Sequence, residues 1–367
     1  MSGLRQFLDL VPQLTGLVLS DTVPFFDILP NLDSDPDSVD FEPGEILGIS
    51  SQSVELLYLR TLEWSYPYPA DVHRFLAYVS TPSLEILDLY LDDLSLNRPD
   101  TALIRGYDST YAVRDDTIFP HVIQLGSLVE LSVQCVDDDA LTLVLRRLAL
   151  PVLEKVAFAN VDIRRRKRDS LAQFPRLESI FRDPRMPCLT HLTLSHFNLD
   201  PEYSRSMLGY MPALSLLSLD TCLGAREILG ALAETSTMSR RLAVKFCPRL
   251  HSLSLLGCDI QAKGLRKVVQ ARNSRESLGK DGQTGLILVS NTRPIKNLRR
   301  PGVTRLASKP VRPSAVPGTT TVFSMDEALC PARIIYICVE ECGSITEEDV
   351  LSLRSLGVED VMWSDGT

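Results

Sequence analysis

A short apolar pattern recurs along the chain and limits the folds that are open to it. "CPRLHSLSLLGC", beginning at Cys247, places Leu250, Leu253 and Leu255 three and two residues apart, with Cys258 three residues later. The same spacing starts at Leu14, Val54, Leu84, Leu128, Leu153, Leu189, Leu214 and Ile334. Because side chains alternate along a strand, the pattern predicts nine short strands that each bury one face.

Between these strands lie one-sided apolar stripes at helical spacing, which predict helices at 72–79, 141–148, 225–232 and 265–269. A strand with this leucine spacing followed by a helix is the signature of a leucine-rich repeat. The predicted fold class is therefore α/β: an irregular leucine-rich-repeat solenoid, with a parallel β-sheet on the concave face and helices and loops on the convex face. The uneven spacing of the strands indicates insertions between repeats.

Composition divides the chain into three predicted parts. Residues 1–274 form the leucine-rich-repeat solenoid, and residues 330–367 form the final repeat with a C-terminal helix. Residues 275–329 are rich in proline, glycine, serine and basic residues and have no sustained apolar period, which predicts a disordered basic insertion. Within it, the span 280–312 carries eight basic residues against Asp281 alone.

The cysteines are predicted to serve the repeat and not chemistry. Cys222, Cys258 and Cys342 each stand eight residues after the first apolar residue of their unit. A thiol at this position is expected to pack inward and to contact backbone groups of the adjoining loop. Neither the spacing nor the number of the eight cysteines indicates a disulfide scaffold.

Charge and motif content exclude several classes of function. The net charge of −9 argues against a general nucleic-acid binder, and no apolar stretch approaches the roughly 18 residues that span a membrane. The five histidines have no nucleophile motif or metal-ligand spacing around them. The acidic run at 33–40 lacks the glycine and glutamate of a calcium loop and is interpreted as a solvated loop. We therefore expect no enzyme activity, no cofactor and no metal.

Two segments, "CPRLHSLSLLGCDIQAKGL" and "CPARIIYICVEECGSITEEDVLSL", resemble the cysteine-containing class of leucine-rich repeat found in F-box/leucine-rich-repeat proteins of fungi. In that family the repeats hold a target protein, while an N-terminal F-box binds the Skp adaptor of a cullin-type (SCF) ubiquitin ligase. No F-box-like helical segment precedes the first repeat, so we expect the chain to begin within a larger solenoid. The resemblance implies a non-catalytic substrate-receptor relative, degenerate or truncated, with Skp and cullin as possible partners.

An alternative hypothesis is a leucine-rich-repeat regulator of a small GTPase or other signalling protein. The expected location is cytoplasmic or nuclear. The basic run at 164–168 fits either a nuclear import signal or a solvated arc between repeats.

The target is predicted to bind the concave sheet. If the third and fifth residues after the first apolar one face the core, those at two, four and six face outward. A mixed polar and tyrosine-bearing surface suits protein recognition. The predicted partner-binding residues are Tyr58, Arg60, Asp88, Tyr90, Glu130, Gln134, Lys155, His191, Asp220, Tyr336 and Glu340.

Overall fold

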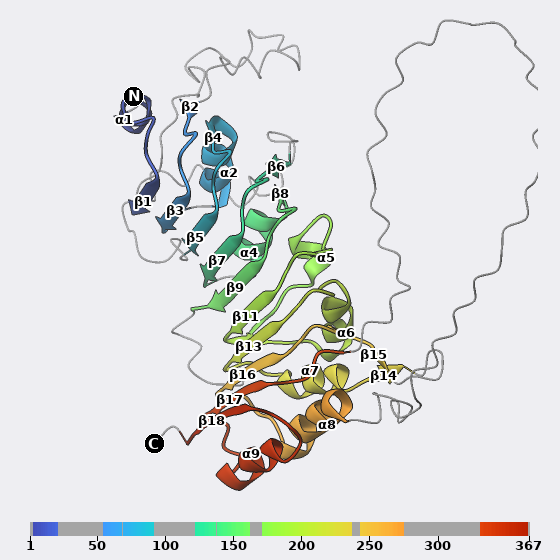
Figure 1. Cartoon of the computed structure of the whole chain (residues 1–367). Helices are drawn as coiled ribbons and strands as arrows, with labels where there is room; N and C mark the ends of the chain where they lie inside the picture. The colour runs from blue at the N-terminus through green and yellow to red at the C-terminus, as the bar shows by residue number, and fades with distance from the viewer. Residues whose placement is uncertain are drawn as a thin grey trace, which may run out of the picture.

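The computed structural model describes residues 3–20, 54–67, 69–91, 122–136, 138–161, 171–236, 243–274 and 331–365. Strands from these segments form one ten-stranded parallel sheet in which neighbours follow chain order (Figure 1). The strands are β1 (Gly16–Ser20), β3 (Thr61–Ser65), β5 (Ile86–Leu91), β7 (Glu130–Cys135), β9 (Lys155–Asn160), β11 (His191–Ser195), β13 (Leu216–Asp220), β16 (Ser252–Leu256), β17 (Tyr336–Glu340) and β18 (Asp360–Ser364).

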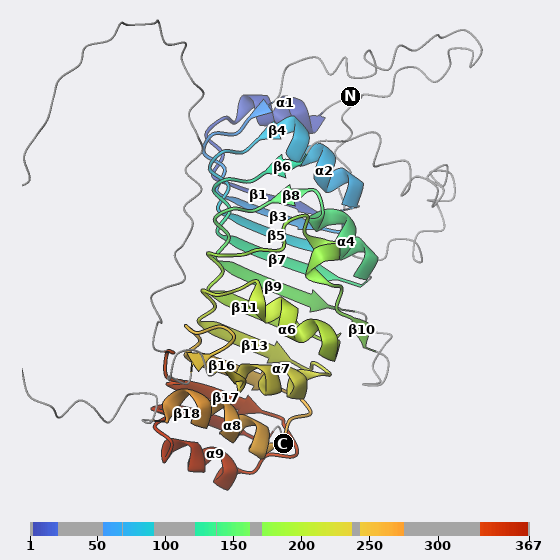
Figure 2. The same ribbon diagram turned by 90° about the vertical axis from the view of Figure 1, so that its right-hand side faces the viewer.

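The helices from α2 onward lie along one side of this sheet, so the architecture is mixed α/β (Figures 1 and 2). The helices are α1 (Gly3–Leu10), α2 (Pro69–Tyr78), α4 (Asp138–Leu145), α5 (Leu177–Ile180), α6 (Pro201–Gly209), α7 (Ala225–Leu232), α8 (Ala262–Asn273) and α9 (Glu347–Arg354). The four predicted helices are confirmed as α2, α4, α7 and α8. Helix α9 begins with a capping box, in which Thr346 Oγ1 accepts the Asp349 N–H while the Asp349 side chain accepts the Thr346 N–H.

Short two-residue strands make further pairs outside the main sheet, before the main strands for β2, β4, β6 and β8 and after them for β10 and β12. The parallel pairs are β2 (Val54–Glu55) with β4 (Val79–Ser80), β6 (Ile123–Gln124) with β8 (Leu148–Ala149), and β10 (Ala172–Gln173) with β12 (Phe197–Asn198). The pair β14 (Thr235–Ser236) and β15 (Ala243–Val244) is antiparallel. The three parallel pairs extend the hydrogen bonding between neighbouring units beyond the main sheet, whereas β14 and β15 pair within the one arc between β13 and β16.

One register runs through the whole main sheet. We number each unit from its first apolar residue, position 0, so that every main strand begins at position 2. Position 2 pairs with position 2 throughout, as His191 does with Lys155 on one side and Leu216 on the other. The carbonyl at position 1 accepts two N–H groups of the next unit: the Glu154 oxygen accepts from Thr190 at 2.8 Å and from His191 at 3.0 Å. This repeated bifurcated contact fixes where each strand begins.

Positions 0, 3 and 5 build the core. In the unit of β11, for example, Leu189, Leu192 and Leu194 are all buried, and the equivalent residues of neighbouring units join them in one continuous apolar cluster. Burial of each leucine contributes roughly 1.5–3 kcal/mol. Because each unit covers the apolar side of its neighbour, stability is shared between adjoining units.

The thiols at position 8 pack inward, as predicted. The Sγ atoms of Cys222, Cys258 and Cys342 lie 3.3, 3.4 and 3.6 Å from the carbonyl oxygen at position 5 of the preceding strand. Burial raises the pKa of Cys222 to about 11 and that of Cys258 to about 12. Both thiols therefore stay protonated at neutral pH, as weak donors that join one unit to the next.

The predicted position of the second strand is wrong. The expected strand used Val54, Leu57 and Leu59, but the main strand is β3, whose unit begins at Leu59 and buries Leu62 and Trp64. Val54 instead belongs to the short strand β2, five residues before position 0, and Leu57 is 48% exposed. An apolar residue at that earlier place reproduces the spacing of the main template, which explains the error.

A tenth strand was missed. Residues 330–367 were expected to form the final repeat with a C-terminal helix, whereas Asp360–Ser364 forms β18 and pairs in parallel with β17. Val358 occupies position 0 and Val361 position 3, both buried. The two acidic residues Glu359 and Asp360 fall at positions 1 and 2, which the template leaves outside the core.

A buried arginine anchors the loop before β16. Arg272 of α8 is 2% exposed. Its Nη2 donates to the Phe246 carbonyl at 2.9 Å, and its Nη1 donates to the carbonyls of Cys247 at 3.0 Å and Leu250 at 3.4 Å. Burial lowers the pKa of Arg272 to about 10, which leaves the guanidinium charged at neutral pH.

The next residue of α8, Asn273, binds the segment that leads into β17. Asn273 Oδ1 accepts the Ile334 N–H at 2.9 Å, and Asn273 Nδ2 donates to the Ile334 carbonyl at 3.0 Å. In the units from β1 to β16 the N–H at position 0 instead donates to a carbonyl three residues earlier, as Leu250 does to Cys247. A side chain therefore replaces the usual turn at this unit.

Three sequence predictions lie outside the described residues: the insertion at 275–329, the basic run at 164–168 and the acidic run at 33–40. Across the ranges that the structure does describe, we find no helix with the length and apolar character needed to cross a membrane.

Candidate functional site

The side of the sheet opposite the helices is the candidate site. Along the main strands, burial alternates: in β7 and β11 the residues at positions 3 and 5 are buried, while those at positions 2, 4 and 6 are partly accessible. Figure 2 shows the helices from α2 onward on the other side of the strands. We call the surface formed by positions 2, 4 and 6 of the ten main strands the exposed face.

Nine of the eleven predicted residues lie on the exposed face. They are Asp88, Tyr90, Glu130, Gln134, Lys155, His191, Asp220, Tyr336 and Glu340. Tyr58 and Arg60 do not, because they precede β3 by three residues and one residue; positions 2, 4 and 6 of that unit are Thr61, Glu63 and Ser65. Arg60 instead lies near Glu85, with Nη1 3.8 Å from Oε1, ahead of both strands.

The in-phase register brings several of the nine together across strands. Lys155 Nζ lies 3.1 Å from Glu130 Oε2, so the lysine is engaged by its neighbour. On the C-terminal part of the face, Tyr336 Oη lies 3.2 Å from Met362 Sδ. Asp220 Oδ1 accepts the Thr221 hydroxyl at 2.9 Å. Most charged groups of the face thus have a local contact.

A thiol on the face, Cys338 at position 4 of β17, resembles no catalytic nucleophile. It donates to Glu340 Oε1 at 3.2 Å. Burial first, and then the neighbouring Glu340, raises the pKa of the Cys338 thiol. A reactive cysteine needs the opposite shift, which positive neighbours supply.

The sequence analysis missed Glu63 on the N-terminal part of the face and Tyr66, which lies just beyond β3 beside the face. Glu63 is the register partner of Asp88, so two carboxylates of adjacent strands project from the same level. Tyr66 follows β3 with a left-handed backbone (φ 64°), and its ring packs edge-to-face on Tyr90 with centroids 5.0 Å apart. Correct placement of the unit at Leu59 would have found Glu63 at position 4, whereas Tyr66 at position 7 lies outside the rows that the rule selects.

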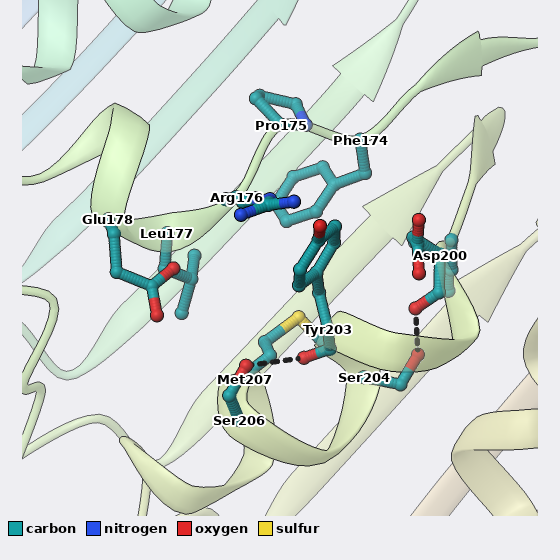
Figure 3. A pocket seen from close by; sticks show the side chains of 11 residues that line it. Phe174, Pro175, Arg176, Leu177, Glu178, Asp200, Tyr203, Ser204, Ser206 and Met207 are labelled. Carbon is teal, nitrogen blue, oxygen red and sulfur yellow. Dashed lines mark hydrogen bonds between the residues drawn. The ribbon is translucent and has the colours of Figure 1, made fainter.

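A crevice on the helix side is too small for a substrate. It lies between the segment around α5 and helix α6, where the Arg176 guanidinium stacks 3.5 Å from the centroid of the Tyr203 ring (Figure 3). Its volume of about 20 Å³ accommodates about one water molecule. Ligand pockets are typically an order of magnitude larger.

Within the described ranges, no group of three His, Cys, Asp or Glu side chains is placed to hold a metal ion. The described histidines also do not gather into an acid–base site. His73 is buried and its Nε2 lies 2.8 Å from the Val144 carbonyl. His191 Nδ1 lies 2.8 Å from its neighbour Thr190 Oγ1, and His196 Nε2 lies 4.0 Å from Asp220. These contacts are each local to one or two units and do not converge.

Comparisons with known proteins add no relative. No protein-family profile matches the sequence, and no curated protein is significantly similar to it. Functional reasoning therefore rests on the exposed face.

Proposed function

We propose that the chain is a non-catalytic protein-recognition module, a leucine-rich-repeat solenoid that holds a target protein on its exposed face. One observation carries the proposal. Ten strands in a single register form a sheet that presents parallel rows of partly exposed side chains on one side, while helices cover its other side. Tyrosines and charges alternate with small residues along these rows, as in protein interfaces. The recurrent inward thiol at position 8 supports the repeat class.

The relationship to substrate receptors of SCF-type ubiquitin ligases rests on the resemblance of the cysteine-containing repeats. A regulator of a small GTPase is the alternative. Affinity purification of the tagged chain from its native cells, followed by mass spectrometry, separates the two. Recovery of Skp and cullin supports the ligase relationship, and recovery of a GTPase supports the alternative.

A steric variant tests whether the face is the binding surface, whatever the chemistry of the partner. Ala157 lies at position 4 of β9, near the middle of the sheet, and Ala157→Trp places a large ring there. Gln270→Trp on the exposed side of α8 is the matched control. We expect Ala157→Trp to lose the recovered partner while the control retains it; retention by both variants would place recognition elsewhere.

A further inference from the structure

The charged side chains of the exposed face are nearly all acidic. Positions 2, 4 and 6 of the described strands carry six carboxylates, at Glu63, Asp88, Glu130, Asp220, Glu340 and Asp360, and a single full cation, Lys155. That lysine is already engaged by Glu130 at 3.1 Å. A surface of this kind attracts cationic groups and repels phosphates.

The residues immediately ahead of the strands add to the imbalance. Position 1 carries Glu85, Glu154 and Glu359 against Arg60. Arg60 lies 3.8 Å from Glu85, so it is also partly compensated. The negative potential therefore extends from the face onto the margin where the strands begin.

Two carboxylates of the face are uncompensated and adjacent. Glu63 and Asp88 are register partners in neighbouring strands, where backbones lie about 4.8 Å apart. Neither has a hydrogen-bond or ion-pair partner among the described residues. Like charges directly opposite each other destabilise a sheet, and a cation supplied by a partner removes that penalty.

The aromatic pair beside these carboxylates suits the same cation. Tyr90 is two residues beyond Asp88 on β5, and Tyr66 directly follows the end of β3, three residues beyond Glu63. The two rings are in edge-to-face contact with centroids 5.0 Å apart. A lysine or arginine whose head group reaches the carboxylates lays its aliphatic stem on these rings. Ring faces attract such cations as well as their apolar stems.

We propose that the exposed face binds a basic segment of a protein partner, with a lysine or arginine side chain seated at Glu63, Asp88, Tyr66 and Tyr90. This inference rests on the proposed recognition function and names the chemistry of the partner. The face and the segment are complementary in charge, and the tyrosine pair supplies an anchor that a dispersed negative charge alone does not.

Neutralising variants test the proposal in the full chain. Fluorescence anisotropy with a labelled arginine- and serine-containing 12-residue peptide compares wild type, Glu63→Gln/Asp88→Asn, and the control Glu202→Gln/Glu227→Gln, which removes the same charge from exposed positions of α6 and α7. We expect the face variant to bind roughly threefold to thirtyfold more weakly, since exposed ion pairs are individually modest. The control should bind like wild type.

A second readout separates this site from a general effect of net charge. Because the Glu63–Asp88 pair is repulsive, the same face variant should be slightly more resistant to urea than wild type although it binds the peptide less well. Equal loss of binding in both variants, or no binding by wild type at low salt, would overturn the inference. The Ala157→Trp experiment is independent of charge, so it can still support recognition by the face if the basic peptide fails.

Discussion

Replacement of Arg272 tests the energetics of the loop that leads into β16. The side chain is buried and donates to three backbone carbonyls without a carboxylate among its hydrogen-bond partners. Arg272→Met keeps the length and helix propensity of the side chain but removes the donors. Among the described backbone contacts, the Phe246 and Leu250 carbonyls then have no donor, whereas the Cys247 carbonyl keeps the Leu250 N–H at 3.0 Å.

The expected loss follows from these contacts. A buried acceptor without a partner costs about 1–3 kcal/mol, and the Leu250 carbonyl, whose donor is 3.4 Å away, adds less than the Phe246 carbonyl. Removal of a buried cation returns part of the desolvation penalty, so we expect the free energy of unfolding to fall by about 1–2 kcal/mol for Arg272→Met. Arg272→Lys should cost more, about 3 kcal/mol or above, because it retains the buried charge but lacks the planar fork that reaches the carbonyls.

Urea denaturation followed by circular dichroism measures both variants, with Lys267→Met on the exposed side of α8 as the control. Hydrogen exchange then locates the effect. The amides of Phe246, Cys247, Arg249 and Leu250 should lose more protection against exchange than amides elsewhere in the described chain. An Arg272→Met protein as stable as wild type, or a lysine variant more stable than the methionine variant, would contradict this prediction. Either result would show that the carbonyls do not depend on the guanidinium.

Two further predictions concern the repeat itself. Leu62→Ala should lower the free energy of unfolding by about 2–5 kcal/mol and Leu57→Ala by less than about 1 kcal/mol, because Leu62 is 0% and Leu57 48% exposed; equal losses in urea denaturation would contradict the corrected register. Cys222 has a pKa of about 11 in the folded chain against 9.0 for its ordinary value, so the stability it contributes is fully present below pH 9 and declines as the pH rises towards 11. Between pH 9 and 11 the unfolding temperature should fall less steeply with pH in Cys222→Ala than in wild type. An equally steep fall in both proteins would contradict a buried Cys222 thiol with a raised pKa.

The repeat was predictable from the sequence wherever its spacing was unambiguous. From β5 to β17, position 0 lies on a leucine or isoleucine whose neighbours at 3 and 5 are also apolar, and every such strand is confirmed. The unit at Leu59 was misread because the short strand β2 places an apolar residue, Val54, five residues earlier. Apolar spacing by itself does not distinguish a unit that starts at Val54 from one that starts at Leu59. The interval to the next unit does, because Leu59 lies 25 residues before Leu84, the same interval as from Leu128 to Leu153.

The candidate face was predictable to the extent that the register was. Nine of the predicted residues lie on it because alternation along a strand is a strict geometric rule. The Glu63–Asp88 pair was missed because it depends on the misread unit, and the Tyr66–Tyr90 pair because Tyr66 follows β3 with a left-handed backbone that strand alternation does not describe. Arg272 was missed although a signal existed: it lies seven residues after Leu265, on the same helical stripe as Val268 and Val269, where a charged residue is expected to be buried.

The buried and the exposed positions of each unit have separate roles, which explains how the chain tolerates like charges side by side on the exposed face. Positions 0, 3, 5 and 8 supply the core and the thiol contacts, so a substitution at positions 2, 4 or 6 leaves that core untouched. A repulsive pair such as Glu63 and Asp88 then costs only on the order of 0.2–1 kcal/mol, which is small beside the burial of even one leucine. Such a pair therefore persists without threatening the fold, and its penalty disappears when a cation binds. Because the inward positions supply the stability of the fold, the residues at the outward positions can match the chemistry of a partner.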